Sequence, residues 1–218
     1  MKKDLAIGYD SFLDLIGNHC YYVDKTRFVK VVMHDKSKVL LITRPRRFGK
    51  TLFMDTLNNF LRIGIDGSSD ITERRRLFEG LEILKDAEFC KTYMCQCPTI
   101  FLSLKSAEGS TFQEAYQAFA RILVGIARSF GFLSDSKNLS SEELLVFNRY
   151  RNLDYMQNPK HQDSVKAFLK NMTEFLSRHY GRQVILLIDE YDVPLAKAVK
   201  GGYYDKMLPL IRGFWAKL

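Results

Sequence analysis

The sequence has 218 residues, of which 46% are hydrophobic and 27% are charged. These proportions exclude a disordered or collagen-like chain and are ordinary for one globular domain. The net charge of +8, from 33 Lys and Arg against 25 Asp and Glu, suits polyanionic partners such as nucleotides or nucleic acid without choosing between them. No apolar run is long enough to span a membrane, and Met1-Lys2-Lys3-Asp4 leads into no signal-peptide core. We therefore expect a cytoplasmic protein with no membrane partner.

The first 37 residues form an N-terminal segment ahead of the predicted core. Apolar residues predict a short helix near Phe12–Ile16, an extended stretch at Tyr21–Thr26 and a second helix through Phe28–Val32. We expect this segment to brace the core, with contact to a nucleotide base as the alternative.

The stretch Val39–Met54 is an apolar run that breaks into a basic turn and then restarts with helical spacing, which predicts a strand, a phosphate loop and a helix. Backbone N–H groups at a helix N-terminus bind phosphates, a lysine neutralises them, and a threonine hydroxyl holds Mg²⁺. Lys50 is the candidate for the neutralising and catalytic cation, and Thr51 is the candidate metal ligand. The predicted nucleotide-binding residues are Arg46, Arg47, Phe48, Gly49, Lys50, Thr51 and Leu52.

This loop departs from the full pattern G-x-x-x-x-G-K-[ST], because Arg44 stands at the position of the first glycine. Glycine at that position permits the tight turn off the strand. By pattern alone, Gly49-Lys50-Thr51 is therefore a weak signal.

The chain then alternates between helical and extended patterns. Gly64–Asp70 is a turn-rich linker, and the helical stretch that follows it ends near Leu84. Within that stretch, Arg74-Arg75-Arg76 is either a solvated helix start or a contact for nucleic acid. Pro98–Leu104 is a convincing strand.

Four cysteines, Cys20, Cys90, Cys95 and Cys97, match neither a dense disulfide framework nor the spacing of a structural zinc site. We expect reduced thiols. Cys95 and Cys97 flank Gln96 and would point the same way on a strand, so a metal or redox role is the alternative.

Three further helices follow the strand. A capping-box pattern at Thr111 starts one that runs to Phe130, and Ser140 caps another that runs towards Tyr150. The stretches at 132–139 and 155–162 are predicted loops. An amphipathic helix over Val165–Leu176 then leads to the next strand.

That strand is Val184–Ile188, five apolar residues followed directly by Asp189 and Glu190, as expected for a strand buried on both faces of a parallel sheet. In P-loop enzymes such a strand delivers an aspartate to Mg²⁺. Asp189 is therefore the second candidate metal ligand, and Glu190 is the candidate catalytic residue that activates the attacking water. The alternative is a core strand with a solvated acidic end.

Three segments together resemble the AAA-ATPase-like family of bacterial proteins. They are Tyr22-Val23-Asp24-Lys25-Thr26, the loop from Arg44 to Thr51, and Asp189-Glu190-Tyr191-Asp192. The resemblance spans nearly the whole chain and implies ATP and Mg²⁺ as ligands; arginine at position 44 looks like the family's own version of the loop. Many members have a nuclease-like domain after the ATPase part, and nothing of that kind is visible in this sequence.

The fold class that follows is α/β: a P-loop NTPase-like parallel sheet with helices on both faces, lacking its last strands. Asp192–Leu195 is a predicted turn, Gly201-Gly202 a break, and Met207–Trp215 one last helix, so no strand remains to hold a sensor residue. We expect a single domain over 1–218, with an N-terminal segment at 1–37 and a nucleotide-binding core at 38–218 that is truncated at its C-terminus.

The predicted function is an ATP- and Mg²⁺-binding P-loop protein and ATP hydrolase of low activity in the isolated chain. An open sheet edge would favour a homo-oligomer. The rival is a nucleotide-gated module that binds DNA or protein with little turnover, in which Arg74–Arg76 would be the partner surface. A nuclease is a poor candidate, because the chain has no Glu-x-Lys pair.

Overall fold

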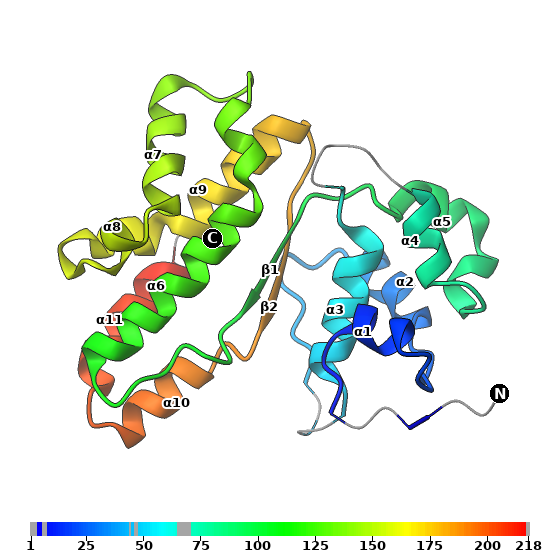
Figure 1. The fold of residues 1–218 in the computed structure, drawn as a ribbon, viewed down its shortest axis with the longest axis horizontal. Helices are drawn as coiled ribbons and strands as arrows, with labels where there is room; N and C mark the ends of the chain where they lie inside the picture. The colour runs from blue at the N-terminus through cyan, green and yellow to red at the C-terminus, as the bar shows by residue number, and fades with distance from the viewer. Residues whose placement is uncertain (1–3, 6–7, 44, 46–47, 65–70, 217–218) are drawn as a thin grey trace. The chain divides into compact units, whose positions relative to one another are not determined.

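The chain divides into two compact units, Met1–Thr99 (unit 1) and Ile100–Leu218 (unit 2), and each is described by itself (Figure 1). The computed structural model describes residues 4–5, 8–43, 45, 48–64 and 71–216.

Unit 1 is built from short helices around α3. They are α1 (Phe12–Gly17), α2 (Arg27–His34), α3 (Lys50–Leu61), α4 (Ile71–Leu77), the 3-10 helix η1 (Glu82–Lys85) and α5 (Ala87–Tyr93). Its core is aromatic: the ring of Phe78 lies 4.8 Å from that of Phe12 and 5.5 Å from that of Phe60, centroid to centroid. Because Phe60 belongs to α3 and Phe12 to α1, this cluster joins the N-terminal segment to the helix that follows the loop.

The segment that leads to the first strand provides hydrogen-bond donors for the last carbonyl groups of α3. The backbone N–H groups of Cys95 and Cys97 donate to the carbonyl oxygens of Phe60 and Leu61, both at 2.9 Å. The last carbonyls of a helix have no partner within the helix, so these two bonds supply what the helix lacks. None of the four cysteines forms a disulfide among the described residues, and Cys20, Cys90 and Cys95 are buried.

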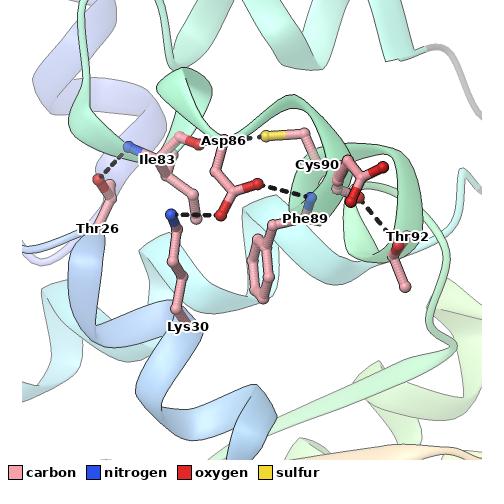
Figure 2. A network of polar contacts seen from close by, with 8 residues as sticks. Thr26, Lys30, Ile83, Asp86, Phe89, Cys90 and Thr92 are labelled. Atoms are coloured by element: carbon pink, nitrogen blue, oxygen red, sulfur yellow. Dashed lines mark hydrogen bonds and ion pairs between the residues drawn. The ribbon is translucent and has the colours of Figure 1, made fainter.

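A polar network attaches α2 to η1 and α5. Lys30 of α2 forms an ion pair with Asp86 at 2.7 Å, and the other carboxylate oxygen of Asp86 accepts the Phe89 N–H at 3.0 Å (Figure 2). The hydroxyl of the fully buried Thr26 accepts the N–H of Ile83 at 3.2 Å (Figure 2). These contacts hold the N-terminal segment on the rest of unit 1, which agrees with the expected bracing role.

Two strands, β1 (Thr99–Ser103), which starts at the last residue of unit 1, and β2 (Ile185–Asp189), pair in parallel in unit 2. Its helices are α6 (Phe112–Ser129), α7 (Ser141–Arg151), α8 (Leu153–Gln157), α9 (Gln162–Tyr180), α10 (Val193–Lys200) and α11 (Tyr204–Trp215), with the 3-10 turns η2 (Gly131–Asp135) and η3 (Pro159–His161). In the core, Phe119 of α6 meets Phe214 of α11 edge to face, with ring centroids 4.9 Å apart.

The two predicted capped helix starts are confirmed. The Thr111 hydroxyl accepts the N–H of Glu114, and Ser140 forms a complete capping box with Glu143. The predicted strands at 98–104 and 184–188 are also present. Each begins and ends within one residue of its predicted bounds.

The predicted strand at Val39–Ile42 is wrong for the described structure. Residues 39–43 have no strand assignment, and the side chains of Val39 and Leu41 are 84% and 62% exposed. An apolar run predicts burial, but a strand also needs a neighbour to take its backbone N–H and C=O groups, and the sequence does not supply that information. The larger P-loop sheet with helices on both faces stays a prediction.

The predicted turn at Asp192–Leu195 is also wrong, because α10 begins at Val193. Pro194 lies in the first turn, where a backbone N–H has no helical acceptor and proline is therefore tolerated. The predicted connection at 155–162 likewise contains the end of α8 and the short η3. No helix in the described parts of the chain is long and apolar enough to cross a membrane.

Candidate functional site

The loop before α3 ends in a left-handed turn at Gly49, where φ is +73°. The Gly49 carbonyl accepts the Phe53 N–H at 2.9 Å, so α3 begins directly at Lys50. Residues with a Cβ adopt this conformation at a cost, whereas glycine adopts it freely. Gly49 therefore places Lys50 and Thr51, both half-buried, as the first two residues of the helix.

The neighbours of this turn are described only in part. Phe48 is 61% exposed, and Leu52 is half-buried, with its carbonyl accepting the hydroxyl of Thr56 at 2.8 Å. Arg44, Arg46 and Arg47 lie outside the described residues. The binding role predicted for Arg46 and Arg47 stays a prediction.

Lys25, which the sequence analysis did not include among the site residues, lies against this loop. Its ammonium nitrogen donates to the carbonyl oxygen of Phe48 at 3.0 Å. It lies 3.4 Å from the place that a Cβ on Gly49 would take. The sequence singled out Lys25 only as part of the Tyr22–Thr26 segment. The contact itself could not be predicted from a local pattern, because it joins residues 23 positions apart.

The first turn of α3 has no acidic residue, and Gly49 has no side chain to cap it. The nearest carboxylate along the helix is Asp55, whose Oδ2 accepts the Phe12 N–H at 2.7 Å. Burial raises the pKa of Asp55, and the hydrogen bond from Phe12 opposes that shift. The N-terminus of α3 thus keeps its positive dipole end without an acidic side chain of its own helix beside it.

The acidic end of β2, in unit 2, contains the two other residues predicted for the site, Asp189 and Glu190. Asp189 is the last residue of the strand, is 5% exposed, and its carbonyl accepts the Leu104 N–H at 3.0 Å. Glu190 is exposed and has a left-handed backbone, with φ at +54°. Its carbonyl accepts the Val193 N–H at 3.1 Å, which turns the chain from β2 into α10.

Unit 2 has an open pocket of about 460 Å³ whose lining includes neither Asp189 nor Glu190. It lies between the β1–α6 connection and α10, and Lys197 on its wall forms an ion pair with Glu108.

Among the described residues, no group of three or more His, Cys, Asp or Glu side chains could hold a metal ion. Mg²⁺ bound with a nucleotide takes one or two protein oxygens, and phosphates and waters complete its shell. The Thr51 hydroxyl, in unit 1, and the Asp189 carboxylate, in unit 2, are each an oxygen donor of the kind that such an ion takes.

The second basic cluster is partly engaged within unit 1. One guanidinium nitrogen of Arg74 donates to both the carbonyl and the side-chain oxygen of Asn59, each at 3.0 Å. Arg75 and Arg76 are exposed. Arg74 therefore joins α4 to α3.

Comparison with known proteins identifies a family that this chain matches. The model of a family described as "Predicted AAA-ATPase" matches residues 6–218. A curated protein described as "Uncharacterized protein in vnfD 5'region", from Azotobacter chroococcum mcd 1, is 46% identical over 57 residues, which are 26% of this chain and 11% of that protein. The match thus spans a small share of that relative's length. No solved structure matches the chain.

Proposed function

This chain belongs to the predicted AAA-ATPase family over residues 6–218, and from that premise we propose that it binds ATP with Mg²⁺ at the loop before α3. The choice of ATP over GTP comes from the family, because the loop residues do not distinguish adenine from guanine.

The observation that best supports the proposal is the left-handed turn at Gly49, followed at once by Lys50 and Thr51. A glycine there leaves room for phosphates to approach the backbone N–H groups of the first helical turn. The positive end of the helix dipole and the Lys50 ammonium both favour an anion at this place. The absence of an acidic side chain from the first turn removes the usual competitor.

Hydrolysis is the finer part of the proposal. Bound Mg²⁺ would neutralise charge on the phosphates, and Thr51 and Asp189 are the residues proposed to hold it. Lys50 stabilises the charge that develops on the γ-phosphate oxygens. Glu190 orients a water and takes its proton as the water oxygen bonds to the γ-phosphorus and the bond to the β-phosphate oxygen breaks.

The backbone of Glu190 supports this role. A non-glycine residue with a left-handed backbone stores strain of about 1–2 kcal/mol, and such residues concentrate at functional sites. At the end of β2, this conformation exposes the Glu190 side chain, whereas Asp189 stays buried. The two neighbouring carboxylates therefore have different surroundings, as two different roles require.

The DNA-binding alternative has no specific observation in its favour. One of its three proposed contact residues, Arg74, donates to Asn59. We therefore do not propose it as a second function.

Isothermal titration calorimetry of the purified chain tests the proposal. ATP with Mg²⁺ should bind with a Kd in the micromolar range, ATP with EDTA should bind more weakly, and AMP should show no measurable binding, because AMP lacks the β- and γ-phosphates that the loop serves. Equal affinity for ATP and AMP, or no heat with ATP, would contradict it.

A further inference from the structure

We propose that Lys25 is a positioning residue of the phosphate loop and adds a positive charge to it from another segment of unit 1. This inference rests on the proposed function. Through Phe48, its ammonium holds the loop in the turn that starts α3, and it favours a polyphosphate beside that turn.

The first step is the position of the ammonium. The Lys25 nitrogen donates to Phe48 O at 3.0 Å and lies 3.4 Å from the Cβ position of Gly49. It is therefore beside the residue that precedes the first helical residue, Lys50. A hydrogen bond from a charged donor is about twice as strong as a neutral one, so it restrains the Phe48 carbonyl more firmly than a neutral contact would.

The second step is the rigidity of the segment that presents Lys25. One carboxylate oxygen of Asp24 accepts the backbone N–H and the hydroxyl of Thr26, at 2.8 and 2.7 Å, and the other accepts the Glu82 N–H at 2.7 Å. Burial works to raise the pKa of Asp24, but these hydrogen bonds outweigh it and hold the pKa below its ordinary value. Thr26 is in turn bonded to Ile83 (Figure 2). Residues on both sides of Lys25 are thus fixed to η1.

The third step is electrostatic. A cation near a helix N-terminus faces the positive end of the dipole, which is unfavourable, and Lys50 adds a like charge at the start of the same helix. An anion at this place is attracted by both ammonium groups and by the positive end of the dipole, and these attractions offset the two repulsions. A local arrangement that costs stability without a ligand and is relieved by one is expected at a binding site.

The alternative is that Lys25 only braces unit 1, as other lysines do. Lys30 provides the matched control: it lies five positions further along the same segment, and its ammonium binds Asp86 at 2.7 Å (Figure 2). Replacement of either lysine by methionine removes one charge and one charged hydrogen bond from unit 1. Of the two lysines, Lys25 contacts the described part of the loop before α3, at Phe48, whereas Lys30 contacts Asp86.

The experiment compares the wild type with Lys25→Met, Lys25→Arg and Lys30→Met. Calorimetry should show that Lys25→Met weakens ATP binding roughly 10–100-fold, as expected from the loss of one bond to a charged group. Lys25→Arg should recover most of the affinity, and Lys30→Met should bind as the wild type does. In the ligand-free chain, hydrogen exchange at the Phe53 amide, which bonds to Gly49, should be faster in Lys25→Met alone.

The outcomes separate the inference from the proposed function. If the wild type binds ATP and Lys25→Met binds equally well, the inference is wrong and the proposed function stands. Equal losses of ATP affinity in Lys25→Met and Lys30→Met, or faster hydrogen exchange throughout unit 1 in Lys25→Met, would show that Lys25 is only a structural brace. Either result would also overturn the inference. If the wild type itself does not bind ATP, both fail.

Discussion

Two residues of the proposed site have left-handed backbones, Gly49 before α3 and Glu190 after β2. At Gly49 the sequence accommodates the turn, because glycine has no Cβ to clash. At Glu190 it does not, and a carboxylate occupies a position that glycine would fill with less strain. The proposed site therefore explains both residue types. Position 49 needs a backbone that phosphates can approach, and position 190 needs a carboxylate.

The two carboxylates after β2 should separate when changed singly. Glu190→Gln keeps the size and backbone of the residue but cannot accept a proton, so ATP should stay bound while hydrolysis slows at least about 100-fold. Asp189→Asn should instead weaken the Mg²⁺-dependent part of ATP binding. Phosphate release and calorimetry measure the two effects. Loss of ATP binding in Glu190→Gln, with Asp189→Asn unaffected, would show that the roles are reversed or absent.

Gly49→Ala tests the turn itself. Alanine at φ +73° costs about 1–2 kcal/mol, and the Lys25 nitrogen 3.4 Å away is the flexible end of a side chain. The variant should fold with a lowered melting temperature and should bind ATP at least about tenfold more weakly, because the first helical turn is displaced. Gly80→Ala, at φ +79° with open space around it, is the control for strain alone. An equal loss of ATP affinity in the two variants would count against a local role for Gly49.

At the scale of the elements, α3 is both the helix of the proposed phosphate site and the centre of unit 1. Its buried polar residues have partners: Asn58 accepts the Thr99 hydroxyl at 2.8 Å, and Asn59 accepts from Arg74. Buried polar groups are costly unless they are bonded, so these contacts fix the neighbours of α3 in one arrangement. The helix start is therefore held by a well-determined framework.

Two aspartates around α3 should respond to pH in opposite ways. Burial raises the pKa of Asp55 above 3.8, so its ionisation costs stability at neutral pH, and that cost disappears as the pH falls below 3.8. Asn at this position can still accept the Phe12 N–H. Asp55→Asn should therefore raise the melting temperature at pH 7, and the gain should shrink towards pH 3.5.

Asp24 provides the opposite case. Its pKa is lowered, so it contributes stability above pH 3.8 that is lost as the pH falls through its folded value. Asp24→Asn should lower the melting temperature at pH 7, with the loss shrinking in acid. Thermal unfolding of both variants between pH 3 and pH 7 measures the pair. Shifts of the same sign at neutral pH would contradict this account of α3 and its surroundings.

Helices whose apolar residues recur at regular helical spacing could be predicted from the sequence. The stripe from Ala115 to Ile126 and the one from Val165 to Leu176 specify α6 and α9, because each contains enough apolar residues at helical spacing to cover one face. Pro194 misled the prediction, since the rule that proline breaks a helix does not hold in the first turn. The run at 39–42 misled it for another reason: strand pairing depends on partners far away in the sequence.

In the candidate site, too, local features could be predicted from the sequence and long-range contacts could not. The positions of Gly49, Lys50 and Thr51 at a helix start followed from the local pattern. The contact between Lys25 and Phe48 did not, because it depends on how the N-terminal segment packs on α3, with Phe12 and Tyr22 meeting that helix through Asp55 and Thr56.

For the whole molecule, a ligand that binds only the folded chain stabilises it by mass action. At a concentration of 100 times its Kd, ATP with Mg²⁺ should add about 2.7 kcal/mol. For a chain of this size, that corresponds to a rise in melting temperature of roughly 5–10 °C. Differential scanning fluorimetry with ATP and, separately, with AMP measures it. A rise of equal size with AMP would point away from the phosphate loop.

The central claim is that ATP binds at Gly49–Thr51, and Lys50→Ala tests it most directly. Calorimetry with ATP and Mg²⁺ should be run on the wild type, on Lys50→Ala and on Lys91→Ala, which removes an exposed lysine of α5 in the same unit. We predict binding by the wild type and Lys91→Ala, and a loss of at least about 100-fold in Lys50→Ala with its melting temperature nearly unchanged. Equal ATP affinity in Lys50→Ala and the wild type would contradict the account.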